Sequence, residues 1–340
     1  ERQDTAKGGC PMSALPETMR VIEMAAPGGP EVLIPGTRAL PDCGTGEVLI
    51  RVTAAGVNGP DLVQRRGHCP PPKGASDLLG LEVSGEVVAC GEGVTKWHPG
   101  DRICALTNGG GYAEFVAVDA SHCLPIPNGV DEVEAAGLPE TFFTVWSNVF
   151  LGHNLPKDGV FLVHGGAGGI GSTAVQLGKA MGLTVLTTIG DDAAAQFVTE
   201  LGADRAINFR TEDFVALTRE AGGADIILDI IGGDYVARNI KAARHDARII
   251  QLAFNMGSKV EIDLMPVMLK RLSYTSSTLR SRPEGFKTQV AEALHETVWP
   301  LFTAQKLRPV THRILPMAEA AEAHRLMEAA EHHGKILLRM

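Results

Sequence analysis

A run of apolar residues, 160–163, leads through His164 into the sequence Gly-Gly-Ala-Gly-Gly-Ile-Gly. The glycines have Gly-x-Gly-x-x-Gly spacing, and they stand directly after a strand pattern and before a helix pattern. Glycine suits such a turn because the chain bends sharply, a pyrophosphate touches the backbone, and the helix presses onto its strand. Amide groups at the helix start then face the phosphates. We therefore expect cofactor contacts at Gly166, Gly168, Gly169, Ile170 and Gly171.

The segment after this loop alternates between helix and strand patterns. Residues 172–181 predict a helix and residues 183–189 a second strand, which completes a βαβ unit. Further helices are expected at 193–201, 213–220 and 235–243, and further strands at 205–209, 224–231 and 248–254. Such apolar strands are typical of a parallel sheet covered on both faces. The pattern predicts an α/β fold with a doubly wound parallel sheet over residues 143–282, whose cofactor lies at the carboxyl ends of the strands.

The rest of the chain is expected to form a second domain, because 340 residues exceed what one compact core usually holds. Residues 20–140 carry short apolar strands separated by glycine and proline, which predicts a mostly antiparallel, barrel-like β domain. Helical patterns at 286–301 and 317–330 and a strand at 335–338 have no core of their own. We therefore predict that residues 19–142 and 283–340 form one domain into which the cofactor domain is inserted.

Composition excludes several classes of protein. The net charge is −9 and no basic stripe is present, so nucleic acid is not expected as a partner. The sequence has no apolar stretch long enough to span a membrane and no signal peptide pattern, which favours a cytoplasmic protein. Six scattered cysteines without a Cys-x-x-Cys pair predict neither a disulfide framework nor a structural zinc site. Residues 1–18 lack periodicity, precede a plausible start at Met12 or Met19, and are expected to be a disordered extension.

Six motifs follow one another in order along the chain. They are 55–61 (Ala-Gly-Val-Asn-Gly-Pro-Asp), 80–85 (Gly-Leu-Glu-Val-Ser-Gly), 99–102 (Pro-Gly-Asp-Arg), 110–114 (Gly-Gly-Tyr-Ala-Glu), 138–146 (Leu-Pro-Glu-Thr-Phe-Phe-Thr-Val-Trp) and 164–171. On these motifs, residues 19–340 resemble the zinc-independent quinone oxidoreductase branch of the medium-chain dehydrogenase/reductase superfamily, the zeta-crystallin-like enzymes. The resemblance implies a Rossmann domain inserted into a GroES-like catalytic domain. It also implies a homodimer or homotetramer formed through the cofactor domains, with residues 272–276 as a candidate contact strand.

The residues at the zinc position of the superfamily decide the expected chemistry. Zinc-dependent alcohol dehydrogenases place a cysteine where Asn58 stands and a histidine where Leu81 stands, and leucine cannot bind zinc. Hydride delivery to an acceptor that is already electrophilic needs positioning and polarisation rather than a metal. The resemblance and these substitutions predict reduction of a quinone, or of an activated alkene, with no zinc.

Three residues are candidates at the reacting end. Asn58 has an amide that can both donate and accept a hydrogen bond, and the alternative is a turn residue before Gly59. Cys69 replaces a tyrosine of close relatives, so it is either a mildly reactive thiol or a change that widens the pocket. The neighbouring His68 is either a proton donor or a surface histidine. Arg280 either attracts the acceptor or is a solvated cation. Asp61 is read as a helix cap or an ion-pair partner and not as an acid.

Residues after the second strand decide the cofactor preference. Asp191 lies about twenty positions beyond the glycine fingerprint, where an acidic residue binds a ribose 2′-hydroxyl and repels a 2′-phosphate; the alternative is a helix cap. NADPH-using relatives carry serine there, a lysine at Ala194 and a tyrosine at Phe209, while Arg210 partly compensates. NAD(H) is therefore favoured over NADP(H). Four more cofactor contacts are expected, at Thr144, Gly190, Phe209 and Phe254, and Thr144 has helix capping as its alternative.

Two classes of function remain open. The leading one is a metal-independent NAD(P)H:quinone oxidoreductase, with an enone or 2-alkenal reductase as a close variant. The alternative is a nucleotide-binding regulatory or structural protein that lacks turnover, for which the change to Cys69 would be the sign. Met265, Met268 and Leu269 are expected to pack against a core, and His332 and His333 to form a surface turn.

Overall fold

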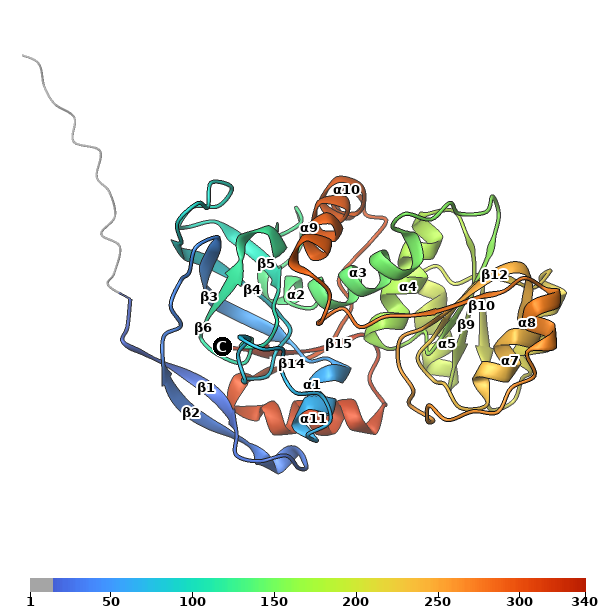
Figure 1. Cartoon of the computed structure of the whole chain (residues 1–340), viewed down its shortest axis with the longest axis horizontal. Helices are drawn as coiled ribbons and strands as arrows, with labels where there is room; N and C mark the ends of the chain where they lie inside the picture. Colours follow the sequence, from blue (N-terminus) through green and yellow to red (C-terminus); the bar gives the residue numbers. More distant parts are fainter. Residues whose placement is uncertain (1–14) are drawn as a thin grey trace, which may run out of the picture.

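The computed structural model describes residues 15–340, and in it the chain forms two lobes, each built around its own β-sheet (Figure 1). Residues 1–14 of the expected extension, with Cys10 and Met12, lie outside the described residues. The first strand begins at Thr18, within the stretch expected to be disordered. Helices of the middle of the chain join the lobes, and the C-terminal strands return to the first one.

The second lobe holds a six-stranded sheet in the order β10-β9-β8-β11-β12-β13, with all pairs parallel. Its strands are β8 (Val160–His164), β9 (Thr184–Ile189), β10 (Arg205–Asn208), β11 (Ala224–Asp229), β12 (Ala243–Gln251) and β13 (Ser273–Ser276). Its helices are α4 (Gly169–Ala180), α5 (Asp192–Glu200), α6 (Phe214–Glu220), α7 (Tyr235–Ala242) and α8 (Met265–Leu269). The predicted doubly wound parallel sheet is therefore confirmed. Strand β12 begins and ends earlier than expected, which leaves Phe254 beyond it.

Strand β8 shows why this sheet needs cover on both faces. All its residues are buried, and neighbours along the strand point to opposite sides. Phe161 and Val163 join the core that contains α4, whereas Val160 and Leu162 join the core that contains α6 and α7. Because both faces of β8 are buried, residues 160–163 form an unbroken apolar run in the sequence.

The first lobe holds a seven-stranded sheet with the path β14-β15-β3-β4-β5-β7, and β6 pairs with β3. Its strands are β3 (Glu47–Gly56), β4 (Glu82–Cys90), β5 (Arg102–Leu106), β6 (Phe115–Asp119), β7 (Cys123–Pro125), β14 (Thr311–Pro316) and β15 (Lys335–Arg339). Only the pair β14–β15 is parallel. No pairing of the described strands joins the two ends, so the expected barrel is open in its hydrogen bonding. Strands β1 (Thr18–Met24) and β2 (Leu33–Ala39) form a separate antiparallel pair.

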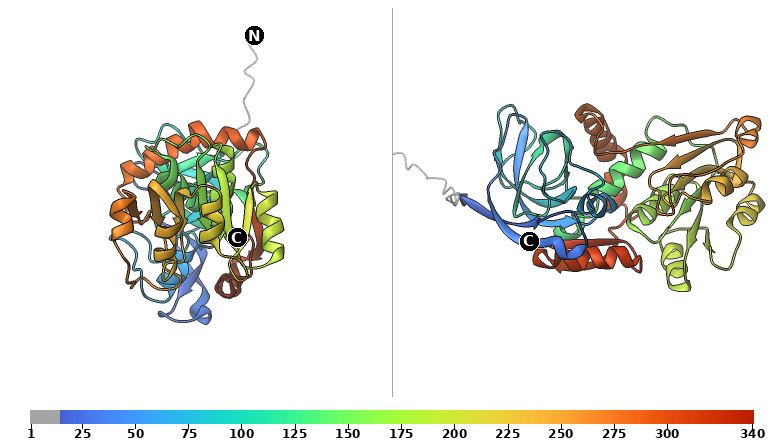
Figure 2. Two further views of the ribbon diagram at one scale, coloured as in Figure 1. Left: turned by 90° about the vertical axis from the view of Figure 1, so that its right-hand side faces the viewer. Right: turned by 60° about the horizontal axis from the view of Figure 1, so that its bottom comes forward.

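The C-terminal strands lie in the sheet of the first lobe, because β15 pairs with β3 and β14 pairs with β15. Figure 2 shows α11 (Ala320–Ala329) beside this lobe. The remaining helices of the lobe are α1 (Gly59–Arg65), α2 (Glu132–Ala135) and α3 (Pro139–Val145), and short 3-10 turns lie at η1 (Pro30–Val32), η2 (Ala120–His122) and η5 (Met317–Glu319).

Between the lobes, aromatic side chains link α3 to the C-terminal helices. The ring of Phe142 lies 6.1 Å from Trp299 and 5.4 Å from Phe302, measured between centroids. The helix expected at 286–301 is divided into α9 (Glu284–Ala293), a π-helical turn η4 (Leu294–Val298) and α10 (Trp299–Thr303). A second π-helical turn, η3 (Trp146–Phe150), follows α3.

Two expectations about burial were wrong. Met265, Met268 and Leu269 are 54%, 64% and 62% exposed on the short helix α8, so they do not pack against a core. His332 and His333 are half-buried rather than a bare surface turn, and His333 stacks on Phe197 of α5. Of the cysteines in the described residues, Cys104 and Cys123 are buried, whereas Cys43, Cys69 and Cys90 are half-buried.

Candidate cofactor and acceptor site

The glycine-rich loop connects β8 to α4, and its glycines have different physical reasons. A Cβ on Gly166 would lie 2.0 Å from Thr187 Oγ1, and one on Gly171 would lie 2.1 Å from the Gly165 carbonyl oxygen. These two are required by the packing of the protein itself. A Cβ on Gly168 would meet only one atom, 3.7 Å away, so space remains open in front of the loop at the start of α4. An open backbone surface at a helix N-terminus fits the pyrophosphate of a dinucleotide.

A series of buried hydrogen bonds holds the glycine-rich loop in place. The Gly165 N–H donates to Thr188 Oγ1 at 3.1 Å, and Thr188 Oγ1 lies 3.1 Å from His164 Nδ1. His164 Nε2 lies 2.7 Å from Asn239 Oδ1, and Asn239 Nδ2 donates to Asp229 at 2.8 Å. Burial lowers the pKa of His164, which keeps the imidazole neutral and able to accept on one side and donate on the other.

Asp191 lies where β9 gives way to α5 and caps that helix. Its Oδ1 accepts the Ala194 N–H at 2.8 Å, so the capping contact considered as the alternative is present. The side chain is exposed, and its second oxygen has no hydrogen bond to a described residue. Arg210 lies close by, with its guanidinium 5.8 Å from the Phe209 ring and 3.8 Å from the Cβ position of Gly190.

The other expected cofactor contacts lie around the same end of the parallel sheet. Phe209 and Phe254 follow β10 and β12, and each is 44% exposed. Ile170 is half-buried in the first turn of α4. Thr144 is half-buried near the end of α3, so it does not cap the start of a helix; its carbonyl accepts from Asn148 at 2.8 Å, and its hydroxyl has no hydrogen bond to a described residue.

A buried charged cluster surrounds Asn58 in the first lobe. Asn58 Nδ2 donates to Glu82 Oε1 at 2.9 Å, and Asn58 Oδ1 accepts from Lys335 Nζ at 2.5 Å. Lys335 Nζ also lies 2.7 Å from Glu82 Oε1. The other oxygen of Glu82 accepts the backbone N–H of Glu140, the second residue of α3, at 2.8 Å. The amide of Asn58 is therefore held on both sides by the protein.

Asp61 is a capping residue, as expected. Its carboxylate accepts the N–H of Asn58 and that of Gly80, both at 2.9 Å. Burial raises its pKa to about 6. Behind it, the Tyr112 hydroxyl lies 3.0 Å from His324 Nε2, and burial lowers the pKa of His324 to about 3, so its imidazole is neutral.

Arg280 is engaged within the protein. Its guanidinium donates to Gln64 Oε1 at 2.6 Å and to the Asn108 carbonyl at 2.6 and 3.0 Å, which ties the segment before α9 to the first lobe. Lys287 of α9 adds a bond from Nζ to Asn108 Oδ1 at 2.6 Å. Cys69 is half-buried and His68 exposed in the loop after α1. The structure thus does not place Cys69 in the cluster around Asn58.

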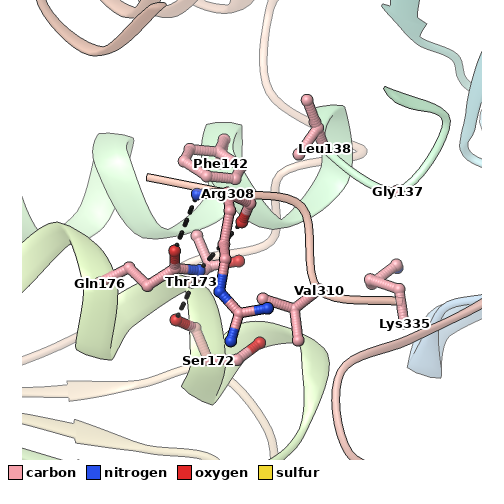
Figure 3. A pocket seen from close by; sticks show the side chains of 9 residues that line it. All are labelled: Gly137, Leu138, Phe142, Ser172, Thr173, Gln176, Arg308, Val310 and Lys335. Carbon is pink, nitrogen blue, oxygen red and sulfur yellow. Dashed lines mark hydrogen bonds between the residues drawn. The ribbon is translucent and has the colours of Figure 1, made fainter. Parts of the chain in front are cut away.

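The second lobe is held to the returning chain at α4 (Figure 3). Gln176 makes a two-point contact with the backbone of Arg308, accepting its N–H at 3.0 Å and donating to its carbonyl at 3.2 Å. Next to this contact lies a cavity of about 10 Å³ that is also lined by Lys335. Gly334 donates from its N–H to Ala167 of the glycine loop at 2.7 Å. The Gly334–Lys335 pair therefore contacts both the glycine loop and the cluster around Asn58.

Three cluster residues were missed as candidates from the sequence: Glu82, Glu140 and Lys335. Each lies inside or beside an apolar stretch, and a charged residue in such a place signals a buried polar group that needs partners. Among residues 15–340, no group of three or more His, Cys, Asp or Glu side chains is arranged to hold a metal ion. No helix in this range is long and apolar enough to cross a membrane.

Comparisons with known proteins identify the family. Residues 44–128 match the alcohol dehydrogenase GroES-like domain, and residues 201–338 match the zinc-binding dehydrogenase family. Quinone oxidoreductase of Rattus norvegicus is 29% identical over 329 residues, which cover 94% of this chain and 97% of the relative. The chain belongs to the quinone oxidoreductase-like branch of the medium-chain dehydrogenase/reductase superfamily.

Some of the relatives that match this chain are much longer proteins. The chain spans only 14% of the length of two mycocerosic acid synthase-like polyketide synthases, from Mycobacterium tuberculosis and Mycolicibacterium smegmatis, at 29% and 27% identity over 87% of the chain. Among solved structures, an NAD-dependent alcohol dehydrogenase has a TM-score of 0.84 and 29% identity, covering 95% of this chain and all of its own. Mycobacterial Rv1454c complexed with NADPH has a TM-score of 0.84 and 26% identity at the same coverage. The CurK enoyl reductase has a TM-score of 0.82 and 26% identity, covering 96% of this chain and all of its own.

Proposed function

We propose that this oxidoreductase reduces quinones with a nicotinamide dinucleotide. The observation that carries the proposal is the glycine loop, where Gly168 leaves open backbone at the start of α4 while its neighbouring glycines are fixed by packing. Similarity to curated quinone oxidoreductases along almost their whole length supports the choice of acceptor. The bound cofactor supplies a hydride, and the chain's own residues bind, orient and protonate.

The chain's contributions follow from the site. The loop amides at 168–171 receive the pyrophosphate, with Gly166 and Gly171 setting the close approach. The carboxylate of Asp191 binds ribose hydroxyls through the oxygen that does not cap α5. Phe209 and Phe254 flank the adenosine end of the cofactor. Thr144 lies along the nicotinamide. Asn58, fixed by Glu82 and Lys335, forms one wall of the acceptor site. Arg280 and Cys69 border the entrance.

We favour NAD(H) over NADP(H) because an exposed carboxylate at Asp191 repels a 2′-phosphate. Arg210 acts against this preference, since its guanidinium lies 3.8 Å from the Cβ position of Gly190 and can attract a 2′-phosphate. Hydride transfer proceeds without zinc in this proposal, because Asn58 and Leu81 replace the cysteine and the histidine that bind zinc in zinc-dependent relatives.

The wider assignments are part of the same proposal. Residues 143–282 form the cofactor domain, and residues 19–142 and 283–340 form the catalytic domain. The protein acts in the cytoplasm on a small molecule, and two copies associate through the exposed outer edge of β13.

A second candidate acceptor is an activated alkene, favoured by the likeness to the CurK enoyl reductase. The test measures the loss of NADH and NADPH absorbance with a small quinone and, separately, with an enone. Quinone turnover supports the proposal, and turnover with the enone alone replaces the acceptor. Tight cofactor binding without either reaction identifies a nucleotide-binding regulatory or structural protein instead.

A further inference from the structure

Glu140 differs from the other buried polar side chains around Asn58. It is 9% exposed in the first turn of α3, yet its carboxyl group makes no hydrogen bond to any described residue. The carboxyl group of Glu140 still has a small contact with solvent. Its oxygens are not among the buried polar atoms that lack a hydrogen-bonding partner. Asn58, Asp61 and Glu82, by contrast, are all hydrogen-bonded within the protein.

The charges around Glu140 come from four elements. Glu82 of β4 and Asp61 of α1 are acidic, and Lys335 of β15 and Lys287 of α9 are basic. The two ammonium groups are already bound, Lys335 to Glu82 and Asn58 and Lys287 to Asn108 and the Arg280 carbonyl. Burial, and next the Glu82 carboxylate, raise the pKa of Glu140 to about 8. The carboxyl is thus mainly protonated at neutral pH and has a proton to give.

The position of Glu140 on its helix directs it to the reacting end. Glu140 and Thr144 are four residues apart in α3 and therefore lie on the same face of that helix. In the proposed function, Thr144 lies along the nicotinamide. A carboxyl one turn away from it stands beside the place where an acceptor must stack to receive hydride.

We propose that Glu140 is the general acid of the reaction, which rests on the proposed function above. Hydride addition brings two electrons and one hydrogen to the quinone and leaves an oxyanion. The O–H bond of the Glu140 carboxyl breaks, its proton forms the new O–H bond of the hydroquinone, and the remaining carboxylate takes a proton from solvent. With an enone the same proton goes to the enolate. Asn58, already held on both sides, is then a positioning residue.

The experiment compares the full-length wild type with Glu140→Gln, which keeps the shape but has no acidic proton. Glu140→Asp keeps the proton one methylene further back, and Glu134→Gln on α2 is the matched control, because Glu134 has no side-chain hydrogen bond to a described residue. We expect kcat with a quinone to fall by about 10²–10⁴-fold in Glu140→Gln. Wild-type kcat should decrease as pH rises through about 8, and Glu140→Gln should lack this limb. Glu140→Asp should restore part of the rate, and Glu134→Gln should match wild type.

The outcomes separate this inference from the proposed function. Wild-type turnover together with an unchanged Glu140→Gln rate and pH profile overturns the role of Glu140 and leaves the quinone reductase intact. A rate loss that is matched by weaker NADH binding or a lowered Tm also overturns it, since the residue is then structural. A wild type that binds NADH but reduces neither acceptor refutes the proposed function itself.

Discussion

A single carboxylate at the end of β9 has two roles available to it. Asp191 uses one oxygen to cap α5 and leaves the other exposed toward solvent. Serine is an equally good capping residue but carries no charge. Substitution by serine therefore separates the cofactor role from the capping role.

We predict that Asp191→Ser lowers the ratio of kcat/KM for NADH over that for NADPH by about tenfold or more, because repulsion of the 2′-phosphate and binding of the ribose hydroxyls are lost together. The measurement is steady-state kinetics with both cofactors. Asp192→Ser is the control, since Asp192 is exposed but lies inside the first turn of α5. An unchanged ratio would mean that Asp191 only caps the helix.

Single residues were the hardest level to predict from sequence. The spacing of glycines was sufficient to find the loop, because it stands between a strand pattern and a helix pattern. Asn58 was found through its position in the family motif, but its two hydrogen-bonding partners, Glu82 and Lys335, are 24 and 277 residues away. No local pattern reveals that such distant charges meet and occupy the amide. Glu140 was missed for the same reason, since its isolation from partners exists only in the folded chain.

Glu140 on helix α3 makes the stability of the protein depend on pH. Glu140 has a pKa of about 8 when folded and, as an exposed glutamate, near 4.5 when unfolded. Between these values the folded chain binds the extra proton, so the free energy of unfolding decreases as pH rises, by up to about 1.4 kcal/mol per pH unit. The stabilisation from Glu140 is complete below the pKa of the unfolded chain, near 4.5, and is lost as pH rises through the pKa of the folded chain, about 8.

We predict that Glu140→Gln removes this decrease in the range from about pH 6 to about pH 8, because glutamine does not titrate. At lower pH both proteins keep the contribution of Asp61, whose pKa is raised to about 6, and the opposite contribution of His324, whose pKa is lowered to about 3. The measurement is urea unfolding of both proteins across that range, with Glu134→Gln as the control. Parallel stability curves for wild type and Glu140→Gln would show that Glu140 is ionised in the folded chain.

Elements were more predictable than residues. The helices and strands of the parallel sheet follow periodicities that are local, and their order was correct from β8 to β12. The errors occurred where tertiary contacts decide. The helix expected at 286–301 is interrupted by the π-helical turn η4, between α9 and the aromatic contacts of α10 with Phe142. Helix α8 has an apolar sequence typical of a core helix. The fold shows that only Val267 packs against a core, while Met265, Met268 and Leu269 remain exposed.

On the scale of the whole molecule, this uncovered apolar surface adjoins the last strand of the parallel sheet. Strand β13 is exposed throughout and ends the sheet, so its outer edge has no partner among the described strands. On α8, Met268 and Leu269 are 64% and 62% exposed. An exposed strand edge next to exposed apolar side chains is typical of a surface that pairs with another chain.

We predict that the protein is a homodimer whose contact includes β13 and α8, and that Met268→Glu with Leu269→Glu shifts it to monomer, because two buried, unpaired carboxylates oppose association. The measurement is light scattering after size-exclusion chromatography over a range of concentrations. Ile34→Glu on β2 is the matched control, because Ile34 is 45% exposed in the other lobe. A wild type that is monomeric at every concentration contradicts the predicted dimer. A dimer that persists in the double variant places the contact elsewhere on the molecule.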